Sequence, residues 1–115
     1  MSEIKFKVSG EGVPEVTPVH TLELSPKVRI IDVRRSEEFT GELGHVKGAE
    51  LVTLETEFMS KLGSWSVDDT YVFVCRSGGR SAHATMVALT KGFKKVYNME
   101  GGMLRWNAEK LPTEK

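Results

Sequence analysis

Apolar residues along the 115-residue chain gather in short blocks that alternate between strand-like and helix-like spacing. Val28–Val33 and Tyr71–Val74 are compact apolar runs, as in buried strands of a parallel sheet. From Ser81 onward, apolar residues recur at helical spacing until Gly92 ends the pattern. This alternation predicts an α/β fold with an open, mostly parallel sheet and helices on both faces.

Weaker blocks continue the same alternation. Further strands are predicted at Ile4–Val8, Ala49–Val52 and Lys95–Tyr97, and further helices at Pro18–Leu24, from Ser36, at Leu54–Leu62 and at Gly102–Glu109. Between the first strand and the first helix, Gly10, Gly12 and Pro14 are expected to break the chain. Because the chain has no repeat and no linker, we expect residues 1–115 to form a single domain.

Composition narrows the function by exclusion. Sixteen basic residues balance sixteen acidic ones, which points to neither nucleic acid nor a membrane surface as a partner. The chain shows neither a signal peptide nor an apolar run of about 20 residues, so we expect a cytoplasmic protein. The single cysteine, Cys75, excludes an internal disulfide and fits a reducing compartment. No Cys or His spacing is typical of a metal site, and we expect neither a metal nor a cofactor.

The stretch VFVCRSGGRSA, Val72–Ala82, places this cysteine where a strand ends and a helix is about to begin. Ligands of open parallel sheets bind just beyond the carboxyl ends of the strands. Gly78 and Gly79 let main-chain N–H groups turn toward one point, and the helix start adds its unsatisfied amides. With Arg76 and Arg80 nearby, this surrounding favours a thiolate over a thiol. We therefore predict that Cys75 is a nucleophile rather than a small buried apolar residue.

Three separated segments together resemble the rhodanese family of sulfurtransferases, in particular its small single-domain members. They are IIDVRRSEEFTGELGHVKGA (Ile30–Ala49), the cysteine stretch above, and GFKKVYNMEGGMLRW (Gly92–Trp106). The resemblance covers residues 28–106 in order and spacing and implies a rhodanese-like sheet. Glu50-Leu51-Val52 departs from the Asn-Ile/Leu-Pro that usually follows in the family, which affects a connecting segment.

The resemblance implies a chemical role for the cysteine loop. Cys75 would attack the outer sulfur of a small donor such as thiosulfate, release sulfite and keep a persulfide, which then passes to cyanide, a thiol or a protein acceptor. The binding loop would comprise Arg76, Ser77, Gly78, Gly79 and Arg80. Its amides would hold the persulfide, the Ser77 hydroxyl could donate to it, and both arginines would attract the dianionic donor.

Three residues of the first segment are candidates for supporting roles. Asp32, at a strand end, could be a general base, but the resemblance favours a structural role that ties loop backbones together. Arg34 and Glu38 stand four residues apart, so they could pair on one helical face. Arg34 could equally line the mouth of the pocket.

Two other functions compete with sulfur transfer. Phosphatases and arsenate reductases of related architecture use Cys-x5-Arg, whose extra residue makes room for a tetrahedral oxyanion. The span from Cys75 to Arg80 is Cys-x4-Arg, which suits a single sulfur atom better. A non-catalytic rhodanese-like binding module is the other alternative, although such modules often lack the cysteine that this chain keeps.

Overall fold

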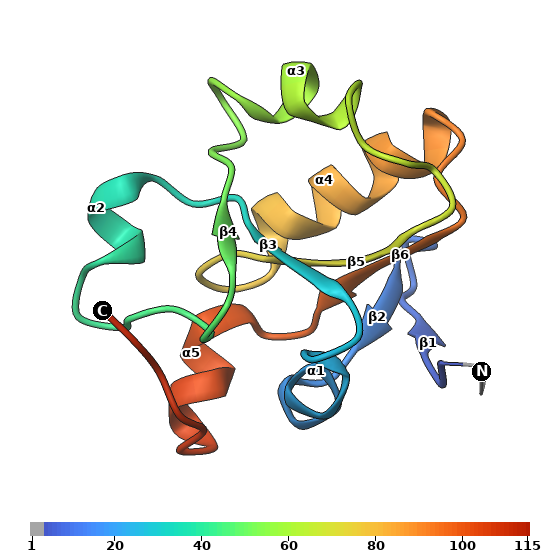
Figure 1. Cartoon of the computed structure of the whole chain (residues 1–115). Coiled ribbons are helices and arrows are strands. Elements are labelled where there is room, and N and C mark those ends of the chain that lie inside the picture. The colour runs from blue at the N-terminus through green and yellow to red at the C-terminus, as the bar shows by residue number, and fades with distance from the viewer. Residues whose placement is uncertain (1–3) are drawn as a thin grey trace.

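The computed structural model describes residues 4–115, and within them one six-stranded sheet runs through the middle of the molecule (Figure 1). The strands are β1 (Lys7–Val8), β2 (Pro14–Val16), β3 (Arg29–Asp32), β4 (Glu50–Leu51), β5 (Thr70–Val74) and β6 (Lys95–Met99). Their order across the sheet is β1-β2-β6-β5-β3-β4. Only the edge pair β1–β2 within these residues is antiparallel, which confirms the prediction of a mostly parallel sheet.

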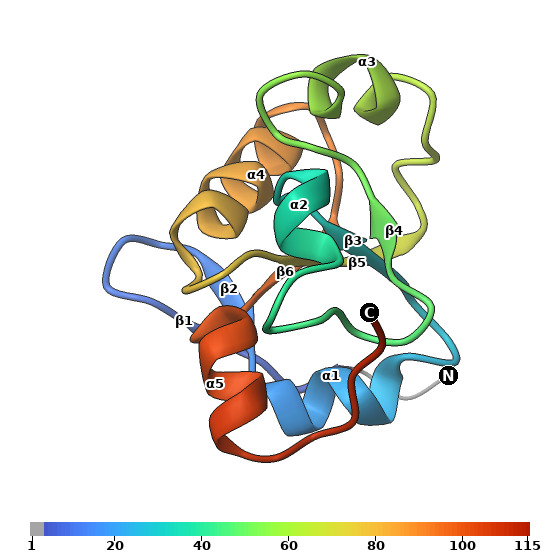
Figure 2. The same cartoon turned by 90° about the vertical axis from the view of Figure 1, so that its left-hand side faces the viewer.

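Helices cover both faces of the sheet, as predicted. They are α1 (Pro18–Leu24), α2 (Ser36–Phe39), α3 (Phe58–Leu62), α4 (Gly79–Thr90) and α5 (Gly102–Ala108). α3 and α4 pack on one face, while α1 and α5 lie side by side on the other (Figures 1 and 2). None of the helices in residues 4–115 has the length and apolar character needed to cross a bilayer.

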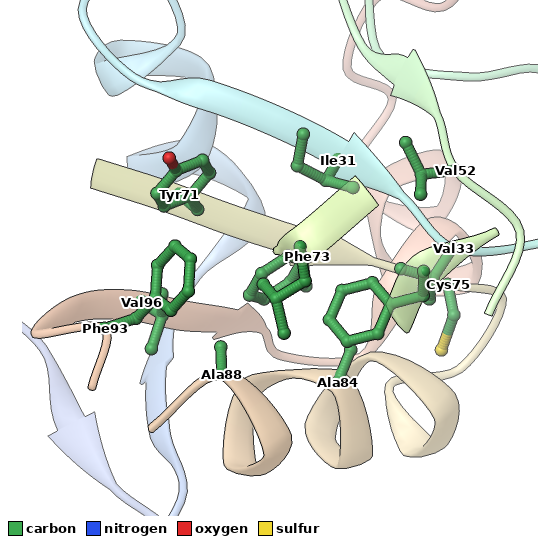
Figure 3. Close-up of a cluster of buried hydrophobic side chains, with 12 residues drawn as sticks. Ile31, Val33, Val52, Tyr71, Phe73, Cys75, Ala84, Ala88, Phe93 and Val96 are labelled. Carbon is green, nitrogen blue, oxygen red and sulfur yellow. The ribbon is translucent and has the colours of Figure 1, made fainter. Parts of the chain in front are cut away.

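Two apolar clusters hold these layers together. On the α4 face, Phe73 of the central strand β5 packs edge to face against Phe58 of α3. Phe73 also lies against Ala84 and Ala88 of α4 (Figure 3). The two alanines let α4 lie close to the sheet, and Cys75 stands at one end of this cluster. The opposite cluster is built around the fully buried Trp106 of α5. The burial of β5 from both sides explains its continuous apolar sequence.

Several predicted elements are shorter than their sequence pattern indicated, the first strand and the third helix among them. The strand expected at Ile4–Val8 is formed only at Lys7–Val8, because β2 offers it only two partner residues. The helix expected at Leu54–Leu62 begins at Phe58. The preceding residues form a turn in which the Glu57 carboxylate accepts a hydrogen bond from the main-chain N–H of Thr53.

The strand β2 was missed altogether. Gly12 and Pro14 are chain breakers by themselves, and the prediction accordingly placed no strand among them. The structure shows that Pro14–Val16 pairs with β1 on one side and with β6 on the other. Three residues carry no periodicity of their own, so pairing with the neighbouring strands makes this segment a strand. The pairing sets Glu15 opposite Asn98.

Candidate active site

The cysteine loop lies beyond the carboxyl end of β5, where ligands of parallel sheets bind. Cys75 follows the strand directly, and Gly78 turns the chain into α4 with a φ of 106°, a left-handed conformation that favours glycine. α4 begins at Gly79, two residues earlier than the Ser81 start predicted. The loop is therefore short, and it leads straight from the central strand into a helix.

The start of α5 is hydrogen-bonded to the main chain of this loop. The main-chain N–H groups of Met103 and Leu104 donate to the carbonyl oxygens of Cys75 and Arg76, each over 2.9 Å. At Gly102, a Cβ atom would lie 2.5–2.6 Å from these same two peptide groups, and its φ of 58° also favours glycine. The glycine pair before α5 thus allows a close backbone contact that fixes the loop.

The sulfur of Cys75 is buried, with 1% of the residue exposed. The main-chain N–H of Gly78 donates to Sγ over 3.1 Å, and the Ser81 hydroxyl oxygen lies 3.2 Å from it. Of the loop amides in the described chain, that of Gly78 is the one bonded to the sulfur. The nearby hydroxyl is that of the buried Ser81, whereas Ser77 is exposed. Gly79 opens α4 and is exposed as well.

Arg80 closes the loop by an ion pair with α2. Its guanidinium donates to both carboxylate oxygens of Glu38 over 2.8 and 2.9 Å, and the Arg35 main-chain N–H also donates to Glu38. These contacts, chiefly the hydrogen bonds from Arg80, lower the pKa of Glu38 to about 2, and the pair raises the pKa of Arg80. The charge of Arg80 is therefore balanced by Glu38. Their ion pair connects α4 to α2 through two residues that lie 42 apart in sequence.

Asp32 and Arg34 form a second, fully buried ion pair. The Arg34 guanidinium donates to both oxygens of Asp32 over 2.9 and 2.8 Å and to the Gly44 carbonyl over 2.7 Å. The Asp32 carboxylate also accepts the Arg34 main-chain N–H. The suggested pairing of Arg34 with Glu38 is wrong, because each has a better-placed partner of its own. The Asp32 carboxylate holds Arg34, and Arg34 in turn bonds the Gly44 carbonyl, so a structural role for Asp32 stays the favoured interpretation.

A hollow of about 260 Å³ opens beside the loop. Its lining consists of Arg34, Glu37, Glu38, Gly41, Glu42, Leu43 and Arg76. The side chain of Arg76 is exposed, and within residues 4–115 it makes no ion pair. Arg76 is therefore the loop cation that can meet an incoming anion, and Arg34 lines the same hollow although its charge is matched by Asp32.

The structure adds three residues that the sequence interpretation did not single out. Ser81 lies beside the sulfur, Asn98 of β6 bonds the Ser81 hydroxyl, and Glu15 of β2 bonds Asn98. Asn98 carried a usable signal, since it is a polar residue inside an apolar strand. Glu15 carried none, because its strand could not be recognised from the sequence.

Comparison with known proteins shows which family the chain belongs to. The profile of the family described as "Rhodanese-like domain" matches residues 19–109. The "Putative sulfurtransferase YtwF" of Bacillus subtilis is 34% identical over 104 residues, covering 85% of this chain and 97% of that protein. "Thiosulfate sulfurtransferase 16, chloroplastic" of Arabidopsis thaliana is 34% identical over 110 residues, with coverages of 86% and 89%.

A solved structure shows the same fold. The rhodanese-like domain protein from Staphylococcus aureus superimposes with a TM-score of 0.73 at 29% identity and covers 88% of this chain and 98% of its own. The chain thus shares its fold with a rhodanese-like domain protein and its sequence pattern with proteins named as sulfurtransferases. This chain belongs to the rhodanese-like domain family, as its three motifs indicated.

Proposed function

We propose that this protein is a sulfurtransferase that carries a sulfane sulfur as a persulfide on Cys75, with thiosulfate or a similar small anion as donor. The observation that supports this most is the setting of Cys75. The only thiol of the chain directly follows β5, takes a hydrogen bond from the Gly78 amide and opens the six-residue span that Arg80 closes in the first turn of α4. Relatives named as sulfurtransferases support the same reaction class.

The reaction would proceed as two displacements at sulfur. The Cys75 thiolate attacks the outer sulfur of thiosulfate, an Sγ–S bond forms, and sulfite leaves with the electron pair of the broken S–S bond. The thiol proton passes to solvent before this step. An acceptor such as cyanide, a thiol or a protein thiol then attacks the terminal sulfur and returns Cys75 as a thiolate.

The loop residues would divide the work between them. Main-chain N–H groups from Arg76 to Arg80 are available to hold the terminal sulfur of the persulfide, which carries the negative charge. Arg76 would attract the donor, because it lines the hollow, is exposed and has no carboxylate partner among residues 4–115. Arg80 would hold the loop in shape through Glu38. Ser77, on the exposed side of the loop, is available to a donor entering from solvent.

The competing functions have less support. A phosphatase or arsenate reductase needs cationic groups around an oxyanion, whereas both charges of Arg80 and Arg34 are matched by carboxylates. A purely binding module would have no need of a nucleophilic thiol. A persulfide carrier works only while its thiol is reduced, so we place the protein in a reducing compartment such as the cytoplasm.

Intact-mass measurement tests the proposal. Incubation with thiosulfate should add the mass of one sulfur atom, and cyanide should then remove it. Cys75→Ser, which keeps the shape of the side chain, should gain no sulfur and show no thiosulfate:cyanide activity. An unchanged mass of the reduced wild type after thiosulfate would contradict thiosulfate as donor, and sulfur transfer by Cys75→Ser would contradict the covalent intermediate.

A further inference from the structure

A row of polar side chains leads from the sulfur of Cys75 across β6 to β2, next to the edge strand of the sheet. The Ser81 hydroxyl lies 3.2 Å from Sγ and bonds Oδ1 of Asn98, while Nδ2 of Asn98 donates to the carboxylate of Glu15 over 2.9 Å. Ser81 and Asn98 are 0% and 2% exposed. Glu15 is half-buried and lines a hollow on the surface, so only the end of the row reaches solvent.

The direction of every hydrogen bond in this row follows from Glu15. A carboxylate can only accept hydrogen bonds, so the part of Asn98 that faces it must be the amide NH2 group. The amide oxygen of Asn98 then faces Ser81 and requires the Ser81 hydroxyl as its donor. A hydroxyl has one hydrogen, and Ser81 uses it toward Asn98, its shortest contact.

This direction matters for the sulfur. With its hydrogen committed to Asn98, Ser81 presents lone pairs to Cys75, an arrangement that suits a thiol, which donates its hydrogen to Ser81. A thiolate would face those lone pairs. To donate to a thiolate, Ser81 would have to leave the buried oxygen of Asn98 without a donor, which is unfavourable. The alternative is for the Asn98 amide to turn over, and the Glu15 carboxylate opposes this.

We propose that Glu15 is a remote positioning residue for Cys75: through Asn98 it sets the direction of the Ser81 hydroxyl and so holds the resting sulfur as a thiol. The proposal deepens the proposed sulfur transfer, because that reaction starts from the thiolate. When Glu15 is neutral, Asn98 can turn over and donate to Ser81, which then donates to the sulfur anion. Residues of three separate elements, β2, β6 and α4, thus together affect the protonation of the Cys75 sulfur.

Other charges lie around both ends of the row. The hollow beside Glu15 is also lined by Lys5, Lys7, His20 and Glu100, and Lys7 pairs with Glu100 over 2.8 Å. Glu100 therefore offers a matched comparison, since it lies in the same hollow without bonding Asn98.

At the sulfur end, the groups of neighbouring elements are paired with each other. Arg80 of α4 is bonded to Glu38 of α2. Asp32, at the end of the adjacent strand β3, is bonded to Arg34. Substitutions at Glu15 leave both pairs intact.

Titration of the thiolate by its ultraviolet absorbance tests the proposal without any assay of activity. Cys75 is the only thiol, so the difference between each protein and its Cys75→Ser counterpart reports this one group. Glu15→Gln should move the midpoint of the titration roughly one pH unit lower, the size expected for one added hydrogen bond to an anion. Glu100→Gln removes the same charge and should move the midpoint by less than a third as much.

The double variant Glu15→Gln/Ser81→Ala separates transmission through the row from a direct effect of charge. If the row carries the effect, Glu15→Gln has no effect on the midpoint in the Ser81→Ala background. The proposal would be overturned if Glu15→Gln shifted the midpoint equally with Ser81 and with Ala at that position. It would also be overturned if Glu100→Gln shifted the midpoint as much as Glu15→Gln, or if Glu15→Gln caused no shift. Failure of sulfur transfer in the mass experiment would leave this titration unaffected, so the two proposals fail independently.

Discussion

The ion pair between Arg80 and Glu38 makes a sharp prediction for Glu38→Gln. The substitution removes the charge but keeps an oxygen that can accept the Arg35 main-chain N–H, so the start of α2 stays capped. The pKa of Glu38 falls from 4.5 to about 2 because of the hydrogen bonds from Arg80. A lowering of this size corresponds to about 3–4 kcal/mol at most, since one pKa unit is worth about 1.4 kcal/mol.

Solvent reduces that figure. The side chains of Arg80 and Glu38 are 31% and 27% exposed, so screening leaves about 1–2 kcal/mol. For a domain of this length, Glu38→Gln should lower Tm at pH 7 by roughly 5 °C. The pKa of Glu38 is lower in the folded state, so its contribution is complete above pH 4.5, the ordinary value, and is lost as the pH falls toward about 2. The destabilisation by Glu38→Gln should therefore shrink by more than half at about pH 3.

Glu37→Gln is the matched control, because Glu37 precedes Glu38 on the same helix, lines the same hollow and makes no ion pair within residues 4–115. Urea unfolding of both variants at the two pH values gives the comparison. Equal stability of Glu38→Gln and Glu37→Gln at pH 7, or a difference that persists unchanged at about pH 3, would refute the reasoning.

Three further predictions concern the loop and its support. Arg76→Ala should raise KM for thiosulfate roughly ten- to a hundredfold, with kcat largely kept and a neutral donor less affected; equal losses for both donors would contradict donor steering. Gly102→Ala should destabilise by at least about 2 kcal/mol in urea unfolding, whereas Gly10→Ala, with open space around it, should change little; equal effects would contradict the close backbone contact. Asp32→Asn should cost about 3–5 kcal/mol, because it leaves Arg34 buried without its carboxylate, and a loss below about 1 kcal/mol would exclude that role.

Local sequence was sufficient to predict the elements that form the cysteine loop. A fully apolar β5, one cysteine, two glycines and a helix start are contiguous, so their arrangement follows from short-range geometry alone. The same holds for α1, where Thr17 caps the helix by accepting the His20 main-chain N–H, as its sequence indicated. The short strand β2 could not be predicted from local sequence, since it forms by pairing with β6 and β1.

The partners of polar side chains were decided by the tertiary structure. Arg80 and Glu38 are 42 residues apart, and Asn98 and Glu15 are 83 apart, so no local spacing could pair them. Helical spacing suggested Arg34 with Glu38 instead, but the end of β3 puts Asp32 closer to Arg34. Hydrogen bonds act over about 3 Å, and only the folding of strand ends into one edge brings such distant residues within that reach. The sequence by itself determined that the single thiol stands between β5 and α4, and the tertiary structure decided which groups surround it.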